Sequence, residues 1–392
     1  MPIIEVKKNH DNIFNLDKDV FELLFNHTIA RRKAKFICAL TSNAIQYDDF
    51  IKLSRTAEVP YPLFFLEKNV IKKIIAEYEK LVYFGVCKDQ LAIASRGDIN
   101  LADISLILKD ITRKQNFLKK YMNNKNSISG IYKRTRMNIV EQAQAMRDLL
   151  GYDIDKIEKL SKEKTFNFLD YGLANNNVFI SLYAHHYTPQ EIDKSLQFSG
   201  IAINDKKCPF LFIKAGDNDS KIEPWGRRLF TAALLISCLC HGECKPVTMD
   251  GKSINLVDDF HYIFAEEFLM PEFYIKNETC SSIYDIHRLA TRYSVSPAAI
   301  TMRLFRLNII NELDKDDYLN WLHNDWAKTT LEKGGGNPLG LEKAINRYNN
   351  RAVVKTIVDR YSSKDITFRE VKNLLCYKKG DSFNIKALQT NA

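Results

Sequence analysis

Two pairs of residues near the middle of the chain have the types and the spacing of metal ligands. Cys238 and His241 are three residues apart, and so are Asp258 and His261. Residues three apart on a helix lie on the same face, so each pair can point in one direction. Thiolate, imidazole and carboxylate groups all bind zinc, and four of them suffice for a tetrahedral site. One hypothesis is therefore a zinc site made by these four residues.

A simpler interpretation places the same residues in the core. A free cysteine is among the most buried residue types, and it packs like a small apolar side chain. A histidine in the last turn of a helix is favoured because the helix C-terminus carries partial negative charge. On this interpretation Cys238 is a core residue, His241 stabilises a helix end and the chain has no resident cofactor. We favour this interpretation over the zinc site.

The segments that carry these residues are expected to be two helices. Residues 229–240 are apolar on all sides, which indicates a helix buried on all faces. Residues 257–273 carry aromatic side chains at helical spacing, and Pro271 should end that helix.

These two helices resemble the pair that holds the active site in the ImmA/IrrE family of zinc peptidases. There the first helix carries Phe-Thr followed by His-Glu-x-x-His, and the second ends in Phe-Ala-x-x-Leu-Leu-Met-Pro. The parts of that pattern present here are Phe230-Thr231, Ala233, Phe264-Ala265 and Leu269-Met270-Pro271. The resemblance implies an α+β protein with a zincin-like metallopeptidase core, in which a small sheet supports the active-site helices.

The residues that perform the chemistry in that family are replaced in this chain. The resemblance places the two zinc histidines at Leu234 and Cys238, the general base at Leu235 and the third ligand at Asp258. Leucine can neither bind zinc nor take a proton from zinc-bound water. We therefore predict a pseudo-peptidase with no catalytic residues. The alternative enzyme is a metallopeptidase with the rearranged site Cys238, His241, Asp258 and His261.

The resemblance also implies a kind of partner. Family members with an intact site cleave repressor-like transcription factors, often in mobile genetic elements or stress responses. A member without the site is expected to bind a repressor-like or antitoxin-like protein without cutting it. We therefore expect a regulatory or sensing protein of a phage, plasmid, toxin–antitoxin or defence locus.

Three regions are expected along the chain. Residues 1–125 should be a helical N-terminal domain. The stretch 47–66 resembles the end of a helix-turn-helix domain. No recognition helix is visible upstream, so we interpret the helix-turn-helix as decayed. Residues 138–312 should form the pseudo-peptidase core, with strands at 177–183, 197–205 and 209–214. Residues 313–392 should form a C-terminal helical region.

A second helix-turn-helix pattern lies within the core region, at residues 283–310. Ser296 should cap its second helix, and Pro297 suits the first helical position. That helix carries Thr301, Arg303 and Arg306, which are suitable for reading DNA. Because this geometry is common in proteins that never bind DNA, we favour packing on the core.

Positive charge is concentrated between residues 113 and 147. This segment holds nine lysines and arginines and one acid, Glu141, so it carries +8 of the chain's net charge of +9. Such a segment indicates an anionic partner, most often nucleic acid. The candidate contacts are Arg113, Lys114, Lys119, Lys120, Lys133, Arg134 and Arg136. A DNA-binding regulator is thus an alternative function, and a solvated helix face with a loop is the plainer explanation.

Composition narrows the class of protein. Hydrophobic residues make up 45% and charged residues 27%, as in ordinary globular proteins. No uncharged apolar run approaches the roughly 20 residues needed to cross a bilayer, so no membrane partner is expected. The first residues contain no apolar signal core, and the eight cysteines are scattered. We expect a cytoplasmic protein with reduced thiols.

Overall fold

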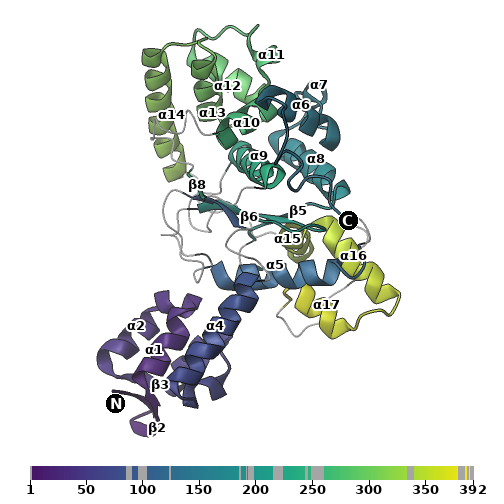
Figure 1. Cartoon of the computed structure of the whole chain (residues 1–392). Helices are drawn as coiled ribbons and strands as arrows, with labels where there is room; N and C mark the ends of the chain where they lie inside the picture. The colour runs from purple at the N-terminus through teal and green to yellow at the C-terminus, as the bar shows by residue number, and fades with distance from the viewer. Residues whose placement is uncertain are drawn as a thin grey trace. The chain divides into compact units, whose positions relative to one another are not determined.

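The computed structural model describes residues 2–84, 91–95, 104–122, 125–184, 187–190, 192, 198–214, 224–242, 246–248, 260–332, 340–377, 385 and 388. The chain divides into two compact units (Figure 1). The first comprises residues 1–88, 99–113 and 189–196, and the second comprises 89–98, 114–188 and 197–392. The division falls inside helix α5 (Ser105–Leu118), between Arg113 and Lys114. The expected regions 138–312 and 313–392 both lie almost wholly in the second unit.

The first unit begins with strands, so the expected helical start is wrong for residues 3–17. Strand β1 (Ile3–Lys8) pairs antiparallel with β2 (Asp11–Asp17) and parallel with the short β3 (Ala44–Gln46). Ile4 and Val6 are buried and alternate with more exposed residues, which is the period of a strand. The hairpin turns at Asn9, whose φ is +59°, in a region that asparagine tolerates better than most residues.

Helices complete the first unit around a phenylalanine-rich core. They are α1 (Lys18–Asn26), η1 (Ile29–Arg32), α2 (Ala34–Ser42), α3 (Tyr47–Ala57), η2 (Tyr61–Phe65) and α4 (Lys68–Phe84). Asp17 caps α1 by accepting hydrogen bonds from the first-turn N–H groups. Phe21, Phe25 and Phe64 contact one another at ring-centroid distances of 4.9 to 6.1 Å. Close aromatic packing of this kind stabilises a core beyond the area it buries.

The second unit contains a five-stranded sheet in the order β5-β7-β6-β4-β8. The strands are β4 (Leu91–Ser95), β5 (Phe179–Leu182), β6 (Phe198–Ile203), β7 (Phe210–Ile213) and β8 (Pro246–Thr248). Strand β6 is antiparallel to both β4 and β7, whereas β5 pairs parallel with β7 and β8 pairs parallel with β4. The strands predicted at 177–183, 197–205 and 209–214 are confirmed as β5, β6 and β7.

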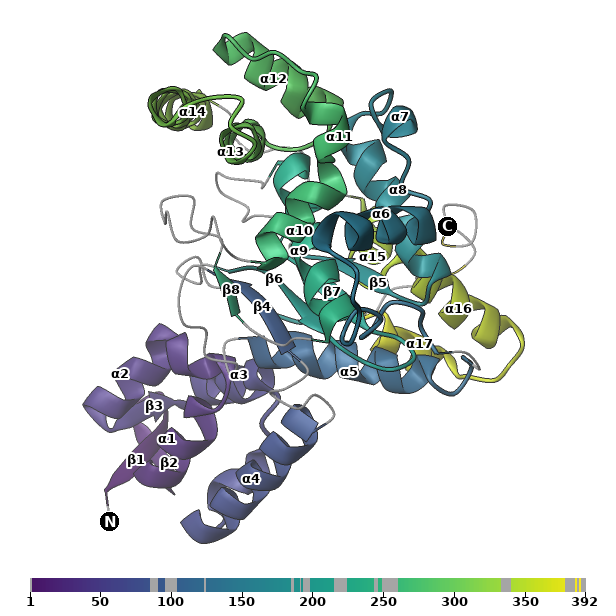
Figure 2. The same cartoon turned by 45° about the horizontal axis from the view of Figure 1, so that its top comes forward.

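Helices cover the sheet. Helix α9 (Trp225–His241) packs against β4, β6 and β7, with α8 (Lys162–Asn175), α6 (Ile139–Leu150) and α10 (Phe260–Leu269) around it (Figure 2). Helix α15 (Leu341–Asn349) contacts β5 on the side away from α9, followed by α16 (Arg351–Ser362) and α17 (Phe368–Leu374) (Figure 1). The fold is thus α+β, as expected.

Further helices extend from the end of α10. They are α11 (Glu272–Ile275), α12 (Ile283–Arg292), α13 (Pro297–Arg306) and α14 (Glu312–Glu332); the short α7 (Ile154–Ile157) precedes α8. Ser296 accepts a hydrogen bond from the N–H of Ala299, and Pro297 is the first residue of α13, so the predicted cap is confirmed. Gly226 of α9 lies against this turn, because a Cβ there would be 2.5 Å from the carbonyl carbon of Val295. Within the part of the chain that the structure describes, no helix is long and apolar enough to cross a membrane.

Candidate functional site

Helix α9 is the central element of the candidate site. It follows Pro224 and ends at Gly242, whose φ of +65° suits a residue without a side chain. Every residue from Arg228 to His241 is buried. The prediction of a helix buried on all faces is therefore confirmed, and any polar residue on α9 must find its partners inside the protein.

The three positions on α9 that the sequence resemblance pairs with two zinc ligands and a general base lie within the core. Leu234 and Leu235 are 0% exposed, and Cys238 is 1% exposed. Leu235 faces strand β6, because a Cβ at Gly200 would lie 3.0 Å from Leu235 Cδ1. The glycine therefore allows the helix to approach the sheet closely, and the side chain of Leu235 fills the space between them.

Helix α10 packs on α9 and supplies the other side of this core. Phe264, Phe268, Leu269 and Met270 are fully buried, and Pro271 ends the helix as predicted. Asp258, the expected third-ligand position, lies outside the described residues. The retained apolar residues of the two helices thus pack α9 and α10 together.

A small buried polar cluster lies between α9, α10 and α6. Ser237 Oγ is 2.9 Å from His261 Nδ1. His241 Nδ1 is 2.7 Å from the carbonyl oxygen of Ser237, one turn earlier on α9. His241 Nε2 is 2.7 Å from Gln142 Oε1 on α6. The two predicted metal-ligand histidines are therefore brought close together, with their ring centroids 5.7 Å apart.

The hydrogen bonds of this cluster decide what His241 can do. The amide nitrogen of Gln142 donates to the carbonyl of Met137 at 2.6 Å, so its Oε1 is the atom that faces His241. Both ring nitrogens of His241 therefore lie within hydrogen-bond distance of oxygen atoms of the protein, one on α9 and one on α6. A histidine that donates to a carbonyl of the last helical turn is the predicted helix-end role.

A thiol also lies beside this cluster. Cys240 Sγ is 3.3 Å from His241 Nδ1, and burial raises the pKa of this thiol well above its ordinary value of 9.0. Among the described residues, no three His, Cys, Asp or Glu side chains are arranged to hold a metal ion. The donor set that the family uses is not reproduced by Leu234, Leu235, Cys238, His241 and His261.

Buried ion pairs join α10 to α13. Arg303 pairs with Glu267 and also donates to the carbonyl of Met270 at 3.1 Å. Arg306 Nε lies 2.7 Å from Glu266 Oε2. Burial raises the pKa of both glutamates, and the arginines oppose that shift.

The predicted packing role of the second helix-turn-helix pattern follows from these contacts. Thr301 is fully buried and donates to the carbonyl of Pro297, while Arg303 and Arg306 are held by the glutamates of α10. The three side chains that could have read DNA are therefore used in packing on the core.

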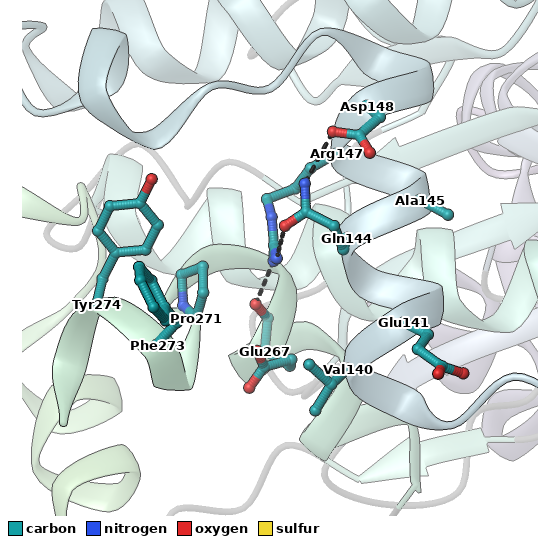
Figure 3. Close-up of a pocket in the computed structure, with 10 residues that line it drawn as sticks. All are labelled: Val140, Glu141, Gln144, Ala145, Arg147, Asp148, Glu267, Pro271, Phe273 and Tyr274. Atoms are coloured by element: carbon teal, nitrogen blue, oxygen red, sulfur yellow. Dashed lines mark hydrogen bonds between the residues drawn. The ribbon is translucent and has the colours of Figure 1, made fainter.

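A pocket of about 550 Å³ opens between α6 and the turn from α10 to α11 (Figure 3). Arg147 lies at its base and donates to the carbonyls of Glu267 and Phe268, at the C-terminal end of α10. Phe273 forms part of its wall and is 80% exposed. The other lining residues are Val140, Glu141, Gln144, Ala145, Asp148, Glu267, Pro271 and Tyr274.

Sequence reasoning did not find this pocket. One signal was available, because Phe273 is an aromatic residue just after Pro271, in a short turn where a large apolar side chain has little core to enter. The exposed charged side chains at the rim, Glu141 and Asp148, are both acidic.

The basic segment separates into two sets of residues. Arg113 lies 3.6 Å from Asp110, Lys119 lies 2.5 Å from Asp205, and Lys114 is buried over the ring of Tyr348. Lys120 is exposed at the end of α5.

The second set lies in the loop between α5 and α6. Lys133, Arg134 and Arg136 are exposed, and within the described residues none of them forms an ion pair. Three solvent-facing cations of the predicted nucleic-acid segment are therefore close together in sequence within one loop.

Comparison with protein families gives one match. Residues 223–305 match the family Peptidase_M78, described as the IrrE N-terminal-like domain. The matched segment includes α9, α10, α12 and nearly all of α13. No curated protein and no solved structure matches the chain.

Proposed function

Because residues 223–305 carry the IrrE N-terminal-like domain of the ImmA/IrrE peptidases, we propose that this chain is a pseudo-peptidase that binds a protein partner without cleaving it. The observation that carries the proposal is the packing of Leu234, Leu235 and Cys238, which are at most 1% exposed. These positions would have to meet zinc, water and substrate in an active peptidase. Here they contact only the protein interior.

The proposed partner is a repressor-like or antitoxin-like protein, as the family resemblance implies. The pocket between α6 and α11 supports this choice on chemical grounds. Its wall carries the exposed Phe273, and its rim carries the carboxylates of Glu141 and Asp148. DNA-binding repressors are rich in lysine and arginine, and a basic segment with one apolar side chain complements this surface. Exposed aromatic residues are frequent centres of binding energy in protein interfaces.

The role follows from binding without hydrolysis. A partner held at this pocket would be sequestered or sensed rather than destroyed, and its level would control release. We assign the chain to a regulatory or defence locus of a mobile genetic element, in line with the resemblance.

The experiment measures binding and cleavage in the same sample. The full chain is titrated with a purified repressor-type protein rich in lysine and arginine, and affinity is measured by biolayer interferometry. Phe273→Ala should weaken binding at least about tenfold, as expected for a central aromatic contact. Tyr284→Ala is the matched control, because Tyr284 is 81% exposed but lies outside the pocket lining.

Cleavage is followed on the same partner by gel electrophoresis, with added zinc and with a chelator. The proposal predicts an intact partner in both conditions. Zinc-dependent cleavage would contradict the non-hydrolytic role, and equal loss of binding in the two variants would contradict the assignment of the pocket.

A further inference from the structure

The loop of residues 125–137 has the composition of a phosphate-binding surface. It contains four exposed cations, Lys125, Lys133, Arg134 and Arg136, and no acidic residue. Part of it lines a shallow pocket of about 400 Å³, formed by Gly130, Ile131, Lys133, Arg134 and Thr135. Two of the lining residues are therefore cations and none is an acid.

Hydrogen bonds fix the loop to the rest of the second unit. The N–H groups of Gly130 and Tyr132 donate to the carbonyls of Leu239 and Cys240, at 2.9 and 2.8 Å. The side chain of Asn126 donates to the carbonyls of Asp205 and Lys206, both at 2.9 Å. The cations therefore project from an ordered backbone. A partner that binds them need not order the loop, so the entropy cost of binding is small.

These contacts also argue against a purely structural role for the cations. A positive charge near a helix C-terminus stabilises its unpaired carbonyls. At the end of α9, however, the carbonyls of Leu239 and Cys240 already accept N–H groups of the loop, and His241 donates to the carbonyl of Ser237. The side chains of Arg134 and Arg136 face solvent, and Lys133 is exposed although its aliphatic stem passes Gly242 at the end of α9.

Backbone groups add to the case for phosphate. The main-chain N–H groups of Arg134 and Arg136 donate to no acceptor among the described residues. Proteins contact nucleic-acid phosphates with arginine and lysine side chains together with main-chain N–H groups. Arginine suits this role because its planar guanidinium donates two parallel hydrogen bonds to a phosphate.

The loop is unsuited to reading bases. Single-stranded nucleic acids are bound through aromatic side chains on which bases stack. The aromatic residue of this loop, Tyr132, is buried, and its hydroxyl donates to the carbonyl of Gln142. We propose that the loop 125–137 binds the phosphate backbone of double-stranded DNA without sequence preference. This proposal is independent of the protein-binding function.

The test uses the full chain and a fluorescent DNA duplex of arbitrary sequence, with anisotropy recorded from 50 to 200 mM NaCl. Four phosphate contacts at a slope of about 0.9 each predict that affinity falls about 100-fold over this range. In the variant Lys133→Ala/Arg134→Ala/Arg136→Ala the fall should be only about 3- to 4-fold, because one contact remains. Its affinity at 50 mM NaCl should also be lower than that of the unaltered chain.

A second variant, Lys159→Ala/Lys164→Ala/Lys355→Ala, removes the same charge from exposed positions elsewhere in the second unit. It should keep the salt dependence of the unaltered chain, and thermal denaturation confirms that both variants are folded. Absence of DNA binding at 50 mM NaCl, or an equal loss of binding in the two variants, would overturn the proposal.

Ile131 and Met137 are also exposed, so binding to vesicles containing phosphatidylserine is measured as well. Stronger loop-dependent binding to vesicles than to DNA would likewise overturn it.

Discussion

Helices α9 and α6 lie in the same unit, yet they place their polar residues in different environments. On α9, Leu234, Leu235 and Cys238 are inside the core, and Ser237 and His241 form hydrogen bonds within the protein. On α6, Glu141 and Asp148 face solvent beside a pocket with an exposed phenylalanine. The comparison shows that neighbouring helices of one unit can bury their polar residues in the core or present them to solvent beside a pocket.

The largest expected effect on the free energy of unfolding comes from placing a charge on the buried helix α9. Leu235→Glu should destabilise the fold by about 3–5 kcal/mol, because an unpaired carboxylate would be buried against strand β6. Urea denaturation measures the change. Leu235→Met conserves volume and should cost less than about 1.5 kcal/mol. A change below about 1 kcal/mol for the glutamate would mean that this position is solvated, as in an open catalytic cleft.

A smaller effect is expected from the polar cluster. Gln142→Leu removes the acceptor that faces His241 Nε2, and an unsatisfied buried donor costs about 1–3 kcal/mol. Thermal and urea unfolding of the variant measure this cost. Unchanged stability would show that His241 Nε2 finds solvent or another acceptor.

A further prediction concerns a carboxyl on α8. Asp170 accepts a hydrogen bond from Asn350 Nδ2 at 2.7 Å, and burial raises its pKa from 3.8 to about 7. Because the folded chain holds this proton more tightly than the unfolded chain, stability falls as pH rises from about 4 to about 7 and then levels off. Asp170→Asn should therefore stabilise the protein at pH 8 by about 1–2 kcal/mol, allowing for partial solvent screening.

The measurement is urea unfolding of both proteins at pH 4.5 and pH 8. The gain from Asp170→Asn should shrink strongly at the lower pH, where the native carboxyl is protonated in the folded chain. A gain of equal size at both pH values would contradict the assigned cause.

The smallest effect on stability is expected at the exposed pocket beside α6. Phe273→Ala should change the unfolding free energy by no more than about 0.5 kcal/mol, because its side chain is largely in solvent. Differential scanning calorimetry measures this directly. A larger loss would show that Phe273 supports the fold, and its effect on partner binding would then need to be attributed to destabilisation.

Local patterns predicted much of the second unit. The apolar run in α9, the short strands β5 to β7, and the Ser296-Pro297 start of α13 are each encoded within a few consecutive residues. The hairpin of residues 3–17 was missed because it is short and polar on one side, so its alternating Ile4 and Val6 give only a weak period.

Interactions between distant segments were not predictable in the same way. A count of charges treats Lys119 and Lys133 alike. Of the two, Lys119 forms an ion pair, and its partner Asp205 is far away in the sequence. Arg147 was likewise counted in the charge of the basic segment, whereas it is buried against the end of α10. The pocket at Phe273 also depends on how α6 and α11 come together, which no single segment encodes.

The most direct test of the central claim is the zinc content of the purified full chain, measured by elemental analysis after incubation with zinc and removal of the excess. The account predicts substoichiometric zinc that does not change in Cys238→Ala or His261→Ala. One zinc per chain that is lost in both variants, together with zinc-dependent peptide hydrolysis, would contradict it and establish a rearranged metallopeptidase site.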